Sequence, residues 1–126
     1  MAKLITLIAS ISGALSVILG AFGAHKLKPR LLDQGHLETF HTASFYHLTH
    51  SIVLLIIGLA SIKFTDSSSL QYAAWANIAG MLLFSGSLYA LCISNTPKLG
   101  IITPFGGVFL IVSWSLLAVF AYKQLG

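Results

Sequence analysis

Four long apolar runs dominate the chain, at about residues 4–24, 40–62, 70–93 and 101–122. None of the four contains Asp, Glu, Lys or Arg. A helix needs about 20 apolar residues to cross roughly 30 Å of hydrocarbon, so each run is long enough to span a bilayer. The period-2 alternation of membrane strands is absent, and an open sheet cannot span lipid. The pattern therefore predicts an all-α membrane protein with four transmembrane helices, folded as one domain.

The connections between these runs differ in length. Residues 63–69 and 95–100 are short polar links, which predict that consecutive helices are antiparallel neighbours in a bundle. The first link, residues 25–39, is longer and mixes charged residues with leucine, proline and glycine. It predicts an interfacial segment with a short amphipathic helix around Pro29–Gln34, lying flat on the membrane. Three leucines of this segment are expected to face the acyl boundary: Leu27, Leu31 and Leu32.

The chain has few charges, and they lie at the ends of the apolar runs. Charged residues make up 8% of the sequence, against about 25% in a soluble domain, so lipid or other protein must cover much of the surface. The net charge is +4, but the cations are scattered singly, as in residues that reach for headgroups, and form no patch for nucleic acid. They do not set an orientation either, because three flank one predicted end of the bundle and four flank the other.

Small residues recur at helical spacing within the spans. Ser12, Ser16 and Gly20 repeat every four residues and place a smooth groove along one face of the first helix. Helix association in lipid depends on such close approach, because burying apolar side chains there gains little. The same role is predicted for three further glycines: Gly86, Gly106 and Gly107. These residues predict tight packing within the chain, with a seam between two copies as the sharper alternative.

Polar side chains gather on one half of the predicted bilayer. The cluster draws on three spans and consists of His25, Tyr46, His47, His50, Ser85 and Tyr89. His50 lies about 15 Å from the start of its helix, close to the midplane, so its imidazole needs a partner inside the bundle. That partner is expected on the third span, where three side chains reach a similar depth: Tyr89, Ser85 and Ser87.

Three interpretations of this cluster stay open. In the first, the histidines are neutral, bond across helices and fix the packing. In the second, the cluster lines a pocket for a small molecule or a quinone headgroup. In the third, His47 and His50 share a metal ion or haem with His25, although no carboxylate lies nearby and one HxxH pair is a weak signal. We predict no cofactor and no resident metal.

Support for catalysis is thin. No Asp or Glu lies in any span to orient a Ser–His pair or to couple transport to an ion. The single cysteine, Cys92, excludes a disulfide within the chain and a cysteine-rich metal site. The sequence therefore favours a protein without enzymatic activity.

Four motifs, in order and at matching spacing, resemble those of a small bacterial inner-membrane family of unknown function, the YgdD-like family, which has a small uncharacterised eukaryotic relative. They are LGAFGAHK, YHLTH, FSGSLY and TPFGG, at residues 19–26, 46–50, 84–89 and 103–107. The resemblance implies four spans, a multi-pass location in the bacterial cytoplasmic membrane and cytoplasmic termini. The chain departs from the family in residues 25–39, where Lys26, Lys28 and Arg30 weaken the usual charge bias. The resemblance implies no biochemical activity.

The leading hypothesis is a non-enzymatic accessory or scaffold component of the cell membrane, because charge is low, the loops are minimal and no catalytic pair is evident. The alternative is a unit that binds or transports a small molecule, lipid or quinone through the His/Tyr cluster. The expected partners are membrane lipid, other membrane proteins or a second copy of the chain, and nucleic acid is not among them.

Overall fold

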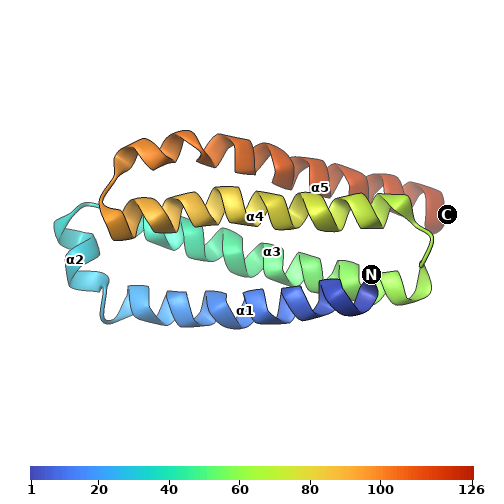
Figure 1. Cartoon of the computed structure of the whole chain (residues 1–126), viewed down its shortest axis with the longest axis horizontal. Helices are drawn as coiled ribbons and strands as arrows, with labels where there is room; N and C mark the ends of the chain where they lie inside the picture. The colour runs from blue at the N-terminus through green and yellow to red at the C-terminus, as the bar shows by residue number, and fades with distance from the viewer.

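The computed structural model describes residues 1–126 and contains four long helices: α1 (Ala2–Ala24), α3 (Leu37–Lys63), α4 (Ser68–Ser94) and α5 (Thr103–Gln124) (Figure 1). Two short helices lie in the connections, α2 (Lys28–Asp33) and the 3-10 helix η1 (Pro97–Ile101). There is no strand. Four helical segments are long and apolar enough to cross a membrane, which confirms the predicted all-α fold.

Local sequence signals explain where the helices begin and end. Ser67 precedes α4, and its Oγ accepts a hydrogen bond from the Leu70 amide at 3.4 Å, which satisfies one free amide of the first turn. The helix ends at Ser94 and is capped by Asn95, whose φ of 51° is a left-handed conformation that Asn tolerates. Gly35 has a φ of 72° and lets the chain turn from α2 into α3. Pro104 lies in the first turn of α5, where its missing N–H breaks no helical hydrogen bond.

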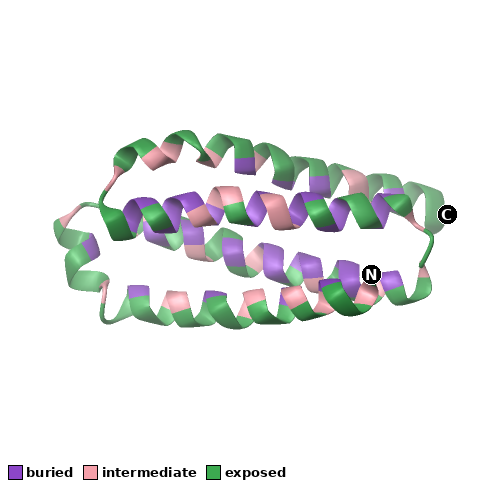
Figure 2. Cartoon of the chain, viewed as in Figure 1, coloured by how far each residue is buried: buried purple, intermediate pink, exposed green.

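Consecutive long helices are antiparallel neighbours: α1 packs on α3, α3 on α4, and α4 on α5. Figure 1 shows α3 behind the space that separates α1 from α4. Both termini lie at one end of the bundle, and α2 and η1 lie at the other. The buried residues follow α3 and α4, whereas α1 and α5 are exposed over most of their surface (Figure 2).

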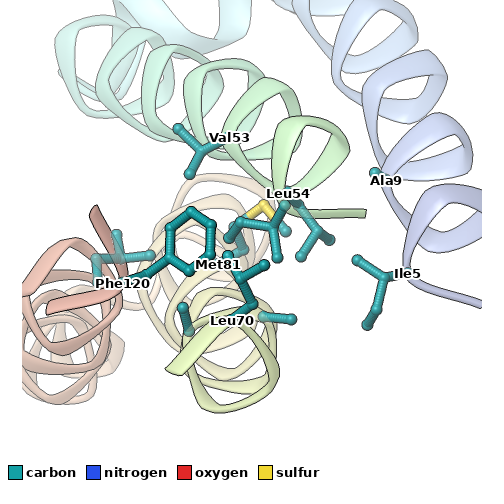
Figure 3. Packing of buried hydrophobic residues seen from close by; sticks show 11 residues of the cluster. Ile5, Ala9, Val53, Leu54, Leu70, Met81 and Phe120 are labelled. Carbon is teal, nitrogen blue, oxygen red and sulfur yellow. The ribbon is translucent and has the colours of Figure 1, made fainter. Parts of the chain in front are cut away.

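Two apolar clusters form the core. The first lies among all four long helices and includes Ile5, Leu54, Leu70 and Phe120 (Figure 3). The second lies near α2 and joins α3 to α4. Its buried members are Leu31, Phe40, Ala43, Leu88, Tyr89, Leu91 and Cys92.

The short helix α2 forms where the sequence predicted it, but its leucines do not share one environment. Leu31 is 2% exposed and belongs to the second cluster, so the expectation that it faces the acyl boundary is wrong. The reason is that α2 packs against α3 and turns this leucine into the protein. Leu27 is half-buried against the same cluster, and only Leu32, at 57% exposed, points away from the bundle.

Glycines bring two pairs of helices into backbone contact. A Cβ atom added to Gly106 would lie 2.7 Å from the Leu83 carbonyl carbon and 2.7 Å from the Phe84 Cα, so α5 crosses α4 without room for a side chain. A Cβ on Gly58 would lie 3.2 Å from the Thr6 Cα, so α1 also approaches α3 closely, although less closely than α5 approaches α4. Packing through small residues is the arrangement expected of helices in lipid.

The predicted packing residues do not all act in this way. Gly86 has no atom within 4 Å of a Cβ position, so its assignment to a helix contact is wrong: it borders the space between α4 and α1. Gly20 does lie against α3, with its Cβ position 3.2 Å from the Ser44 hydroxyl. Ser16 is 3% exposed, and Gly107 makes only ordinary van der Waals contact with α4.

Candidate functional site

The side chain of His47 links three helices. Its Nδ1 lies 3.1 Å from the Tyr89 hydroxyl on α4, and its Nε2 lies 3.0 Å from Ser12 Oγ on α1. Ser12 Oγ lies 2.7 Å from Ser51 Oγ, and Ser51 donates to the His47 carbonyl oxygen at 2.8 Å. We call these four side chains the His47 network. Ser12 stands near the middle of α1, so the network lies deep in the hydrocarbon region.

One assignment of hydrogens satisfies every group in the His47 network. A carbonyl oxygen only accepts, so the Ser51 proton goes to the His47 carbonyl, and Ser51 Oγ must accept from Ser12. Ser12 then has no proton left for the ring, so His47 donates to it through Nε2–H. The remaining nitrogen, Nδ1, accepts from the Tyr89 hydroxyl. His47 is therefore a neutral imidazole with both ring nitrogens in use.

His50 bonds to a different helix. Its Nδ1 lies 2.9 Å from the Tyr46 carbonyl oxygen and so carries the proton, and its Nε2 accepts from the Trp114 indole N–H on α5 at 3.2 Å. The expected partners on α4 are therefore wrong. His47 and His50 are three positions apart, so their side chains point roughly 60° apart around the helix axis. This difference directs His47 towards α1 and α4 and His50 towards α5.

The other members of the predicted cluster do not lie together in the structure. Tyr46 stacks on the His50 ring, with 12° between the ring planes. Ser85 donates to the Ala43 carbonyl oxygen at 2.9 Å and so joins α4 to α3. His25 does not join the cluster: it is exposed at the end of α1, about 20 Å along the helix from the level of Ser12.

The geometry favours the first interpretation of the histidines, in which they fix the packing. No group of three His, Cys, Asp or Glu side chains lies close enough to hold a metal ion. The nitrogens of His47 and His50 point at different helices, and all four have hydrogen-bond partners. An imidazole that is neutral and saturated on both sides holds helices together without offering a free base or a free ligand atom.

Three important polar positions escaped the sequence analysis. Ser51 completes the His47 network, and Trp114 is the partner of His50. A Trp in the middle of a span, away from the interface that Trp prefers, is a signal that could have identified the second of these. Asn77 on α4 is 0% exposed, and neither polar atom of its side chain has a hydrogen-bond partner. Asn77 stands within the apolar run 70–93, so this buried amide could also have been identified from the sequence.

A groove of about 360 Å³ runs between α1 and α4, with His47 of α3 at its floor. Ile8 and Leu19 mark its ends on α1, about 16 Å apart along a helix axis. The wall is almost wholly apolar, and the polar side chains that border it are Ser12, His47, Ser85 and Tyr89. Because α1 and α4 are held together mainly through α3, the groove opens sideways, in the middle of the spans.

The model of the family described as "Protein of unknown function (DUF423)" matches residues 19–107. The chain belongs to this family. It is 40% identical over 123 residues to the UPF0382 membrane protein YwdK of Bacillus subtilis (strain 168), covering 98% of this chain and 99% of the relative. It is 38% identical over 124 residues to the UPF0382 membrane protein SAB0533 of Staphylococcus aureus (strain bovine RF122 / ET3-1), covering 98% and 99%. No solved structure matches the chain.

The family is one of small membrane proteins of unknown function, which is the type of family expected from the four motifs. The names of the relatives state a membrane location and give no substrate, activity or partner. Together with the four helices that can span a bilayer, they establish a multi-pass membrane protein.

Proposed function

We propose that this protein is a non-enzymatic membrane protein that binds the hydrocarbon chain of a membrane-dissolved molecule in the groove between α1 and α4. The observation that carries the proposal is the groove itself, which has about 360 Å³ of space and opens sideways at the depth of the lipid chains. Binding sites for small molecules in proteins have volumes of roughly 300–1,000 Å³ and mostly apolar walls with a few polar groups.

The dimensions of the groove favour a single chain over a helix. A helix with its side chains is about 10–12 Å across, and over the length of the groove its body would need several times the available space. A hydrocarbon chain is far thinner and needs no hydrogen-bonding partner. Gly86 adds room on the α4 side, because no atom lies near its Cβ position.

Photo-crosslinking in lipid nanodiscs tests this proposal. An alkane that carries a diazirine should label groove residues such as Ile11 and Leu82, and excess unlabelled alkane should compete the labelling away. Labelling of Ile111 on α5, which is 66% exposed and lies outside the groove, should not saturate. Gly86→Leu fills the groove and should remove the competable labelling, whereas Ala118→Leu, which adds similar bulk on an exposed position of α5, should not. Labelling that never saturates in the groove would reject the site.

An accessory or scaffold role is the second candidate, and the exposure of α1 favours it. Only four of the 23 residues of this helix are buried, so most of its surface is free to meet another membrane protein. Purification from native membranes in mild detergent, followed by mass spectrometry, tests this role. A stoichiometric partner that is lost when Val17, an exposed residue of α1 outside the groove, is changed to Trp would support it, and a clean monomer would speak against it.

We also propose that the protein lies in the bacterial cytoplasmic membrane with both termini in the cytoplasm. The bacterial relatives named as membrane proteins support the location, and the resemblance to the inner-membrane family supports the orientation. A fluorescent protein fused after Gly126 should fluoresce, and alkaline phosphatase fused there should be inactive. An active phosphatase would place the termini outside.

A further inference from the structure

The polar groups that border the groove between α1 and α4 have one property in common: their protons are already used. Ser85 donates to the Ala43 carbonyl oxygen. Tyr89 donates to His47, and His47 donates to Ser12. Ser12 in turn donates to Ser51, away from the groove. The direction of this series is fixed at its end, because the last acceptor is a carbonyl oxygen, which cannot donate.

The unused hydrogen-bonding capacity at the groove is therefore of one kind. A hydroxyl oxygen that donates its proton and accepts one hydrogen bond still has a lone pair, and this applies to Ser12. The oxygens of Tyr89 and Ser85 also keep lone pairs after donating. No N–H or O–H of these side chains is left for an incoming acceptor. A carbonyl, ester or ether oxygen in the groove would find no donor, and burying it unpaired is unfavourable.

We infer that the groove selects a neutral chain that carries a hydroxyl group over the same chain with only an acceptor oxygen. The inference rests on the proposed binding of a chain in the groove. A charged ammonium donor does not fit, because no Asp or Glu borders the groove to pair with it. A quinone headgroup, which has only acceptors, fits poorly as well. The ligand class is thus a hydroxyl-bearing lipid or long-chain alcohol whose O–H reaches the level of the His47 network.

A matched pair of probes tests this selectivity. 1-Tetradecanol and 1-methoxytetradecane have the same chain, and the O–H of the first is replaced by O–CH3 in the second, which removes the proton donor. Each is used to compete with the diazirine alkane in nanodiscs at equal mole fraction in the lipid. The alcohol should compete roughly three- to tenfold better, the ratio expected for one hydrogen bond inside a membrane protein. Gly86→Leu should abolish competition by both.

Substitution of Ser12 should reverse the preference. Ser12→Ala removes the acceptor of the His47 Nε2–H and leaves a free donor, so the ether should now compete at least as well as the alcohol. Ser10→Ala is the matched control, because Ser10 is exposed and bonds only within α1. Tyr89→Phe uncovers an acceptor, His47 Nδ1, and should keep the preference for the alcohol. It also serves as a second variant if Ser12→Ala does not fold.

The outcomes separate this inference from the proposed function. Saturable competition with an alcohol-to-ether ratio of about one or less in the unmodified protein would overturn the inferred preference for a hydroxyl group. The groove would still be a binding site for a hydrocarbon chain. An unchanged preference for the alcohol in Ser12→Ala would also overturn the inference. Absence of saturable competition by either probe would reject the groove as a binding site, and with it the inferred preference for a hydroxyl group.

Discussion

Replacing Gly106 with alanine is expected to lower the free energy of unfolding by about 2 kcal/mol, while the same replacement at Gly86 should leave it unchanged or raise it slightly. The Cβ of the first variant would lie 2.7 Å from two backbone atoms of α4, which cannot rotate out of the way. The helices α4 and α5 must separate, and the contacts along their whole crossing weaken. At Gly86 the new methyl group meets no atom within 4 Å, and alanine is the better helix former.

Reversible unfolding by SDS titration in mixed micelles, followed by circular dichroism, measures both variants under the same conditions. The comparison is internally controlled, because the chemical change is identical and both positions are in helices that span the membrane. Equal losses at the two positions would mean that the spacing of small residues, and not the local approach of backbones, determines packing here. Loss confined to Gly86 would contradict the helix arrangement itself.

The sequence was sufficient for the number of long helices, and the ends of the predicted apolar runs lie within three residues of the helix ends. Apolar runs without charge have one stable form in lipid, so length and composition decide it. The amphipathic segment around Pro29–Gln34 did form a helix, but its contact with α3 through Leu31 depends on how the connection folds back, which composition does not encode.

The candidate site was only partly predictable, because side-chain direction around a helix axis cannot be read from depth alone. His50 was expected to find its partner on α4, but it bonds to Trp114 on α5. His47, for which three interpretations stayed open, bonds to α1 and α4. The glycines show the same limit. The sequence does not distinguish Gly86 from Gly106, because both are small residues within a span. In the structure Gly86 borders the groove, whereas Gly106 lies where α5 crosses α4.

The groove arises from a relation among three helices and has no local sequence signature. It exists because α1 packs on α3 and stays apart from α4 along its middle. The apolar residues that line it, such as Ile11 and Leu82, would be equally suitable for facing lipid. The hydrogen-bond directions at its floor depend on Ser51, a residue whose role appears only when α1 and α3 are seen together.

Replacing His47 with leucine is expected to lower the free energy of unfolding by about 2 kcal/mol. The substitution leaves the Tyr89 hydroxyl without its acceptor and removes the N–H that donates to Ser12 Oγ. Both groups lie where no water can replace the lost partner. His41→Leu is the matched control, because His41 is exposed on the same helix, and its loss should stay within about 0.5 kcal/mol.

A double-mutant cycle decides whether the cost comes from the broken network or from a poorer fit of the leucine. Tyr89→Phe alone leaves His47 Nδ1 unpaired and should cost about 1 kcal/mol. In the variant that combines both changes, the hydroxyl and the imidazole are absent together, so its loss should fall short of the sum of the single losses by at least about 0.5 kcal/mol. Strictly additive losses would show that the 3.1 Å contact between these two groups contributes no coupling energy. The stability of the bundle would then rest on the glycine crossings and the apolar core.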